Sequence, residues 1–158
     1  MLRTIGTTAL LLAALAAPTA AVTAGEFDKP VAARKAVMKL NSFYLGQLGA
    51  MAKGKVGYDA GKAQRAADSL LALAKLDASA MWPAGSGNDM LGDGTRAKPE
   101  IWGANSDVGA KSKDLETAVE ALVKVAGSGL DGLGGAVKAV GKTCGGCHKP
   151  YRAEKKKQ

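Results

Sequence analysis

The chain has 158 residues, a net charge of +8 and an apolar content of 47%, which indicates one folded domain. Only 4% of the residues are aromatic and none interleave with the basic ones, so the positive charge does not indicate a nucleic-acid-binding protein. The cluster Arg152, Lys155, Lys156 and Lys157 is typical either of a solvated helix end or of a surface that attracts an acidic partner.

The first 24 residues have the three parts of a secretory signal. Arg3 makes a short basic start, residues 7–17 are apolar, and Val22-Thr23-Ala24 ends in small residues. The apolar stretch is too short to span a bilayer as a helix, although an uncleaved anchor remains the alternative. We therefore expect cleavage after Ala24 and one periplasmic domain, residues 25–158, without a later membrane span.

The next two segments have the spacing of amphipathic helices. Residues 28–52 begin with Asp28 and Pro30, which favour a first helical turn. Apolar residues then recur every three or four positions, at Val37, Leu40, Tyr44, Leu48 and Met51. A second helix is predicted to start after the capping residue Asp59. Its inward positions are Ala63, Ala66, Ala67, Leu70, Leu71 and Ala74.

Residues 77–105 lose this periodicity and form the longest irregular segment, a type that often carries function. A third helix is predicted from Ser106-Asp107 to about residue 126, and a fourth from about Asp131 through residue 151. We find no alternating strand pattern and no internal repeat. Four helices with short first and third connections predict an all-α protein, an antiparallel up-down four-helix bundle.

The only two cysteines and the only histidine lie together as Cys144-Gly145-Gly146-Cys147-His148. This C-x-x-C-H pattern is the attachment signature of haem c: two thiols form thioethers, and the adjacent imidazole ligates the iron. A thioredoxin-like pair would follow a strand, a structural zinc site needs four ligands, and a disulfide this short constrains little chain. The apolar stripe of the fourth helix places these side chains on its buried face.

The first helix is predicted to form the opposite side of the haem. In an up-down bundle the start of the first helix lies beside the end of the fourth. Arg34, Met38, Asn41 and Leu45 share one stripe there, and Met38 supplies the sulfur nearest the level of His148. Met38 is a candidate sixth ligand or a packing residue, while Met81 and Met90 are less constrained alternatives in the irregular segment.

Three features together resemble the class II c-type cytochromes, the cytochrome c′ family including its low-spin methionine-ligated relatives. The first is the C-x-x-C-H motif followed by Lys149-Pro150-Tyr151-Arg152. The second is Arg34 four residues before Met38. The third is the pair of segments 82–86 and 95–102, of which the latter ends in Ile101-Trp102. The resemblance spans most of residues 25–158. It implies one covalent haem c on Cys144 and Cys147, with His148 as the proximal ligand.

The resemblance also implies contacts from the chain to the haem. Arg34 matches a basic residue of the family near the haem propionates and the proximal imidazole, and Thr95 and Arg96 match positions that line the haem edge. Lys35 stands where many members have glutamine. Family members often form homodimers through their first two helices.

Two functions remain open from the sequence, and they differ in whether Met38 ligates the iron. The main expectation is an electron carrier whose iron has His148 and Met38 as ligands and whose partner is another redox protein. The alternative is a five-coordinate cytochrome c′ that binds NO or CO. A peroxide-active haem enzyme is a weaker idea, because no acid/base pair is evident; we do not expect an enzyme.

Overall fold

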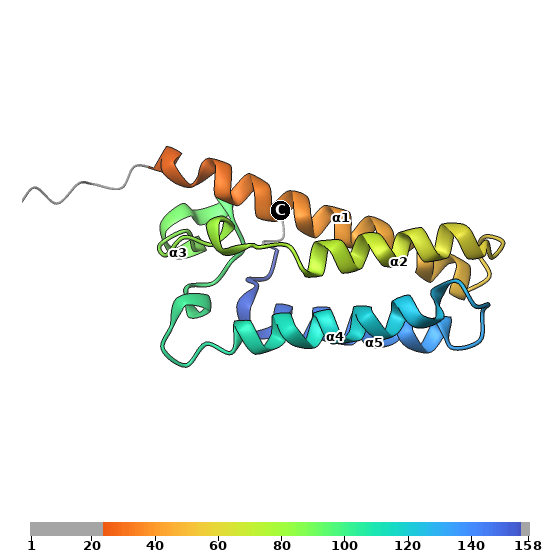
Figure 1. The fold of residues 1–158 in the computed structure, drawn as a ribbon. Helices are drawn as coiled ribbons and strands as arrows, with labels where there is room; N and C mark the ends of the chain where they lie inside the picture. The colour runs from red at the N-terminus through yellow and green to blue at the C-terminus, as the bar shows by residue number, and fades with distance from the viewer. Residues whose placement is uncertain (1–23, 156–158) are drawn as a thin grey trace, which may run out of the picture.

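The computed structural model describes residues 24–155, so most of the predicted secretory signal (residues 1–23) and Lys156 and Lys157 lie outside the described residues. Four long helices make up the bundle: α1 (Asp28–Ala52), α2 (Ala60–Ala74), α4 (Val108–Ala126) and α5 (Leu133–Tyr151). Figure 1 shows α1 and α2 as one pair and α4 and α5 as a second pair, with each helix antiparallel to the next. The predicted all-α bundle is confirmed.

The helix ends follow from local chemistry. Asp59 caps α2, because its carboxylate accepts a 2.8 Å hydrogen bond from the backbone N–H of Lys62. Gly54 follows α1 with φ +66°, and Gly132 precedes α5 with φ +82°. Side chains with a Cβ rarely adopt this left-handed region, so glycine allows the chain to leave one helix and enter the next within a short connection. The predicted bounds of the four helices agree with these ends to within about two residues.

The main core fills the half of the bundle that lies toward the two short connections. Each long helix contributes fully buried side chains to it, and α2 packs on both α1 and α4. The fully buried residues of largest volume are Leu48, Leu70, Val119, Leu122, Leu133 and Val140. Burial of an aliphatic side chain of this size contributes about 1.5–3 kcal/mol, so this cluster stabilises the pairing of the helices that carry the predicted haem residues.

One residue of the predicted inward face of α1 is exposed, and Val37 and Tyr44 are only half-buried. Leu40 is 44% exposed, whereas Leu48 and Met51 on the same helix are buried as predicted. The reason is the direction of its side chain: Leu40 lies about 80° around the helix axis from the fully buried Leu48, at the edge of the face that packs on the other helices. The periodicity shows which residues share a face, but not how much of that face the neighbouring helices cover.

The segment predicted to be irregular contains four short helical turns, η2 (Ser79–Met81), α3 (Asn88–Leu91), η3 (Gly92–Gly94) and η4 (Pro99–Trp102). With η1 (Ala24–Phe27), they gather at the end of the bundle where α1 begins (Figure 1). Ile101 and Ala97 form a second small core with Tyr151 at the end of α5. The segment therefore closes the end of the bundle that holds the C-x-x-C-H motif.

Within residues 24–155, no helix combines the length and apolar character needed to cross a membrane.

Candidate haem-binding site

Helix α5 carries the predicted haem attachment residues in its last two turns. Cys144 is half-buried beside the main core, and Cys147 is half-buried beside the second core that contains Tyr151. Both thiols are free. A three-residue spacing puts them on one side of the helix about one turn apart, facing apolar surroundings. This is the arrangement that two thioether bonds to one planar group require.

Burial sets the protonation state of these groups. Desolvation raises the pKa of both thiols, so they remain protonated and inert as they stand in the folded chain. Desolvation also lowers the pKa of the half-buried His148 imidazole, and the positive charges of Arg152 and Arg96 lower it further. The imidazole is therefore neutral at neutral pH, which is the form that ligates a metal.

The contact between α1 and α5 fixes which residues face His148. A Cβ added at Gly49 would lie 3.9 Å from Val137 Cγ1, so the two antiparallel helices touch at this level. Eleven residues further along α5 is His148, and eleven residues back along α1 is Met38. Since both helices rise about 1.5 Å per residue, Met38 lies at the level of His148. This is the register that the sequence predicted for the start of the first helix.

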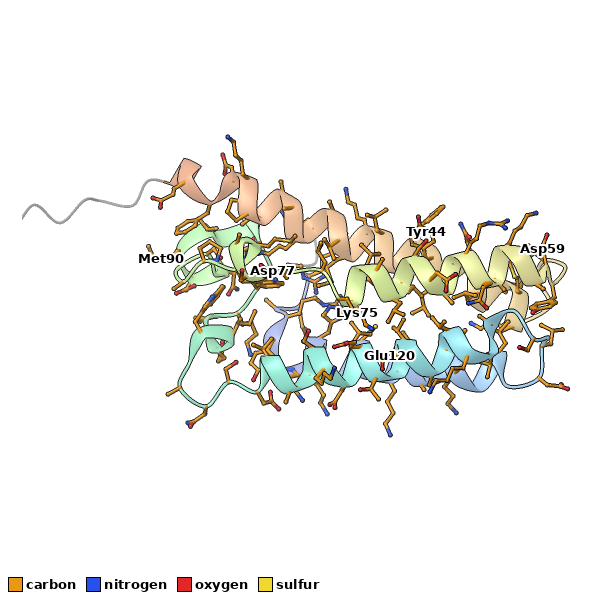
Figure 2. The ribbon with its side chains drawn as sticks, in the orientation of Figure 1. Tyr44, Asp59, Lys75, Asp77, Met90 and Glu120 are labelled. Carbon is orange, nitrogen blue, oxygen red and sulfur yellow. The ribbon has the colours of Figure 1, made fainter. Side chains whose placement is uncertain are left out.

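The Met38 side chain is 45% exposed and belongs to neither core cluster. The other two methionines considered from the sequence lie in the closing segment. Met90 on α3 is 66% exposed at the outer end of the molecule (Figure 2), and the Met81 carbonyl accepts a weak 3.4 Å hydrogen bond from Arg34. Of these three methionines, Met38 is the one that the register of α1 and α5 places at the level of His148.

Arg34 is buried, with 3% of its surface exposed, and it connects α1 to the closing segment. Its Nη1 donates to Ser86 Oγ at 2.7 Å, and its Nη2 donates to the Ser86 carbonyl at 2.6 Å and to Thr95 Oγ1 at 2.8 Å. The guanidinium also stacks 4.6 Å above the ring centre of Trp82. Burial lowers its pKa, yet an arginine stays charged at any physiological pH.

The other predicted haem contacts lie in the same closing segment. Lys35 Nζ donates to the Gly94 carbonyl at 2.6 Å, and Arg96 Nε donates to the Ala153 carbonyl at 2.7 Å. The backbone N–H of Ala153 returns a 2.8 Å hydrogen bond to the Arg96 carbonyl. A short antiparallel bridge joins Ala97 to Arg152, four residues after His148. The structure thus brings Arg34, Lys35, Thr95 and Arg96 together at the His148 end of the bundle.

Two partners in this region could not be identified from the sequence. Ser86 is fully buried and accepts two of the Arg34 hydrogen bonds, and the Tyr151 hydroxyl donates to the Asp107 carboxylate at 2.6 Å. The hydrogen bond from Tyr151 holds the pKa of Asp107 below its ordinary value. The Asp107 side chain makes no hydrogen bond that caps α4, and instead it anchors the end of α5.

The residues present fit a covalent haem. Two protonated thiols, one neutral imidazole and an apolar lining lie on one side of α5, facing a wall from α1 without a carboxylate. Among residues 24–155, no three His, Cys, Asp or Glu side chains come together as a metal-binding group. The donor set therefore suits an iron that brings its own equatorial ligands rather than a bare metal ion.

Comparison with known proteins agrees with this site. A family model described as Cytochrome C′ matches residues 29–152. Cytochrome c-554 of Cereibacter sphaeroides is 35% identical over 151 residues, covering 96% of this chain and 98% of that protein. The solved structure of a cytochrome c′ from Rhodobacter is 38% identical with a TM-score of 0.78, covering 82% of this chain and 98% of that one.

A second solved structure, a cytochrome c′ variant from Alcaligenes xylosoxidans, is ferrous and has bound NO. It is 27% identical with a TM-score of 0.70, and the match covers 82% of this chain and 97% of that chain. The two cysteines, the single histidine and the helical bundle that positions them are therefore those of a haem c protein, and the chain belongs to the cytochrome c′ family.

Proposed function

We propose that this chain is a periplasmic monohaem cytochrome c′ that binds NO or CO at five-coordinate ferrous iron. Cys144 and Cys147 would hold the haem, and His148 would be its one protein ligand. When bound, the haem supplies the redox-active iron and the coordination position for the gas. Export follows from the secretory signal predicted in residues 1–24.

The α1 wall opposite His148 carries the proposal. Arg34, the first residue of the stripe, is bonded to the closing segment. The wall is therefore made by Met38, by Asn41, whose side-chain amide donates to the Val37 carbonyl at 3.1 Å, and by the half-buried Leu45. None of these side chains is an acid or a base. A weakly polar wall of this kind suits neutral diatomic gases, since the polarity of the distal side decides what a haem iron binds.

The comparisons support gas binding ahead of electron transfer, which the sequence had placed first. The solved relative from Alcaligenes xylosoxidans is a ferrous cytochrome c′ variant with bound NO. In the proposed function Met38 crowds the position opposite His148 and does not ligate the iron.

The residues around the motif have supporting roles in the proposal. Four N–H groups of Arg34 already have protein acceptors, so we assign Arg34 to holding the closing segment rather than to a haem carboxylate. Thr95 shares this network. Lys35 and Arg96 are exposed cations near the same end and are the residues that could face the haem carboxylates.

The first prediction concerns Met38. The oxidised wild type is expected to show a high-spin absorption spectrum, and Met38→Ala to keep it. Because the smaller side chain removes crowding opposite His148, NO and CO should bind the reduced variant about tenfold faster, a barrier change of about 1.4 kcal/mol. Stopped-flow absorbance measures both rates. Met90→Ala, on the exposed α3, is the control and should leave the rates unchanged.

An electron carrier is the second candidate, favoured by the sulfur atom at the level of His148. In that case the oxidised wild type would be low-spin with a sulfur-to-iron charge-transfer band. The loss of this band in Met38→Ala but not in Met90→Ala would contradict the gas-binding function and establish the carrier.

The outer side of α1 also supports a homodimer. Phe43 is 58% exposed and Leu40 is 44% exposed, and they lie three residues apart on α1. Leu40→Lys/Phe43→Lys is expected to shift the holoprotein to a monomer in analytical ultracentrifugation, because buried charges would oppose each other across the interface. Leu130→Lys, at an exposed apolar residue in the α4–α5 connection, is the control. A wild type that is monomeric at high concentration would rule the dimer out.

A further inference from the structure

The charges of the molecule are segregated. All six ion pairs within residues 24–155 lie in α2, α4 and the segments next to them, and none includes a residue of α1 or α5. Lys75 of α2, for example, pairs with Glu120 of α4 at 3.0 Å, and Figure 2 shows the two side chains together. α5 contains three lysines and no acidic residue, and α1 has one acidic residue, Asp28, at its start.

The three lysines of α5 form one ridge. Lys138, Lys142 and Lys149 are exposed, and their spacings of four and seven residues put them within about 40° around the helix axis. We call them the lysine ridge. It lies on the side of α5 opposite Val140 and Tyr151, which are buried. Without a paired carboxylate, the ridge projects its field into the solvent over about one Debye length, roughly 8 Å at physiological ionic strength.

Beside the lysine ridge, α1 and α5 enclose a groove of about 560 Å³. It is hollow because Gly46, Gly49 and Gly141 have no side chains to fill it, and Val137 forms part of its floor. Lys53 and Lys55 line its far end, and no carboxylate lines it. Val137 and Gly141 of the groove lie on one stripe of α5 that continues through Gly145 to His148, at spacings of four, four and three residues. The groove therefore follows the stripe that leads to His148.

We propose that the lysine ridge and this groove are the docking surface for an acidic electron-transfer protein. That partner would donate one electron to the ferric haem, becoming oxidised as the iron becomes ferrous, with no proton transferred. The inference rests on the proposed function, because gas binding at ferrous iron requires a reductant.

Charge and position select this partner. A surface rich in carboxylates complements the unpaired lysines, whereas a second copy of the chain would oppose lysines to lysines. The helix that carries the ridge also carries Cys144, Cys147 and His148. The thiols lie on its other side, so the width of one helix, about 10 Å, separates a protein docked on the ridge from the haem attachment site. Electron transfer slows steeply with distance, and therefore needs this proximity.

The test compares two triple variants of the holoprotein that each remove three charges. Lys138→Gln/Lys142→Gln/Lys149→Gln neutralises the lysine ridge, and Lys62→Gln/Lys113→Gln/Lys124→Gln neutralises exposed lysines of α2 and α4. The probe is an acidic flavodoxin in its hydroquinone form, and stopped-flow absorbance follows haem reduction. At low ionic strength the ridge variant should react about tenfold more slowly than the wild type, and the control less than about twofold. The difference should vanish at about 1 M salt, where the Debye length is about 3 Å.

Equal slowing in the two variants would overturn the proposal, since net charge alone would then explain the rates. The proposal would also be overturned if a neutral hydroquinone reduced the ridge variant as slowly, relative to the wild type, as flavodoxin does. The substitutions would then have changed the reactivity of the haem and not the docking. Loss of binding to phosphatidylglycerol vesicles in the ridge variant, with unchanged flavodoxin kinetics, would assign the surface to a membrane instead. NO binding to the same samples after chemical reduction tests the proposed function separately, so failure of one does not imply failure of the other.

Discussion

Cys144→Ala/Cys147→Ala is expected to retain no haem after acid–acetone extraction, whereas the wild type keeps all of it. The two thiols lie on one side of α5 against apolar residues, and the structure offers no other cysteine to form a thioether. His148 alone would hold a haem by coordination, which acid breaks by protonating the imidazole. Absorbance of the protein after extraction, with mass spectrometry, measures the bound haem.

Single substitutions and a control sharpen this result. Cys147→Ala should leave at most one thioether through Cys144, visible as a shifted haem absorption band. Gly145→Ala lies between the cysteines on the exposed side of α5, with no atom within 4 Å of the added Cβ, and should retain the haem fully. Full retention of haem by Cys144→Ala/Cys147→Ala after acid–acetone extraction would contradict the assignment of the motif.

Arg34→Met is expected to lower the free energy of unfolding by about 2–4 kcal/mol. The substitution removes the donors to the Ser86 carbonyl and to the Ser86 and Thr95 hydroxyls. Ser86 Oγ keeps its hydrogen bond to the Pro83 carbonyl, and Thr95 Oγ1 keeps the one from the Ala97 N–H. The loss of a donor to the buried Ser86 carbonyl costs about 1–3 kcal/mol, and the lost bonds from the charged guanidinium to the two hydroxyls add to it, partly offset by relaxation of the segment. Because that segment is tied to Ala153 and Arg152 beyond α5, its loosening should also increase hydrogen exchange at the end of α5. Urea unfolding of the holoprotein, followed by circular dichroism, measures the stability.

Two further variants serve as controls for Arg34→Met: the same substitution at an exposed arginine, and a lysine at position 34. Arg65→Met, at an exposed site on α2, should change stability by no more than about 0.5 kcal/mol. Arg34→Lys should recover only part of the loss, because an ammonium cannot reproduce the two-pronged contact with Ser86 and Thr95. Equal stability of Arg34→Met and Arg65→Met would show that the network does not support the closing segment.

The sequence predicted the haem attachment residues of the site more fully than the role of Arg34. The haem attachment residues depend on local spacing, so the sequence named Cys144, Cys147 and His148 and also placed them on the buried side of a helix. The role of Arg34 depends on residues 52 and 61 positions away, Ser86 and Thr95. Without the family resemblance, the sequence favoured an ordinary solvated helix charge at this position. The family resemblance drew attention to Arg34 but did not indicate that its N–H groups are already bonded within the protein.

By itself the sequence determined the four helices, their order and the haem motif, since helical periodicity, caps and glycine breaks act over a few residues. Only the tertiary structure decided which faces are covered. It exposed Leu40, which lies at the edge of the buried face of α1, and it placed Met38 at the level of His148. It also separated the paired charges of α2 and α4 from the unpaired lysines of α5, because the position of each carboxylate relative to each lysine is set by the packing of helices far apart in the chain.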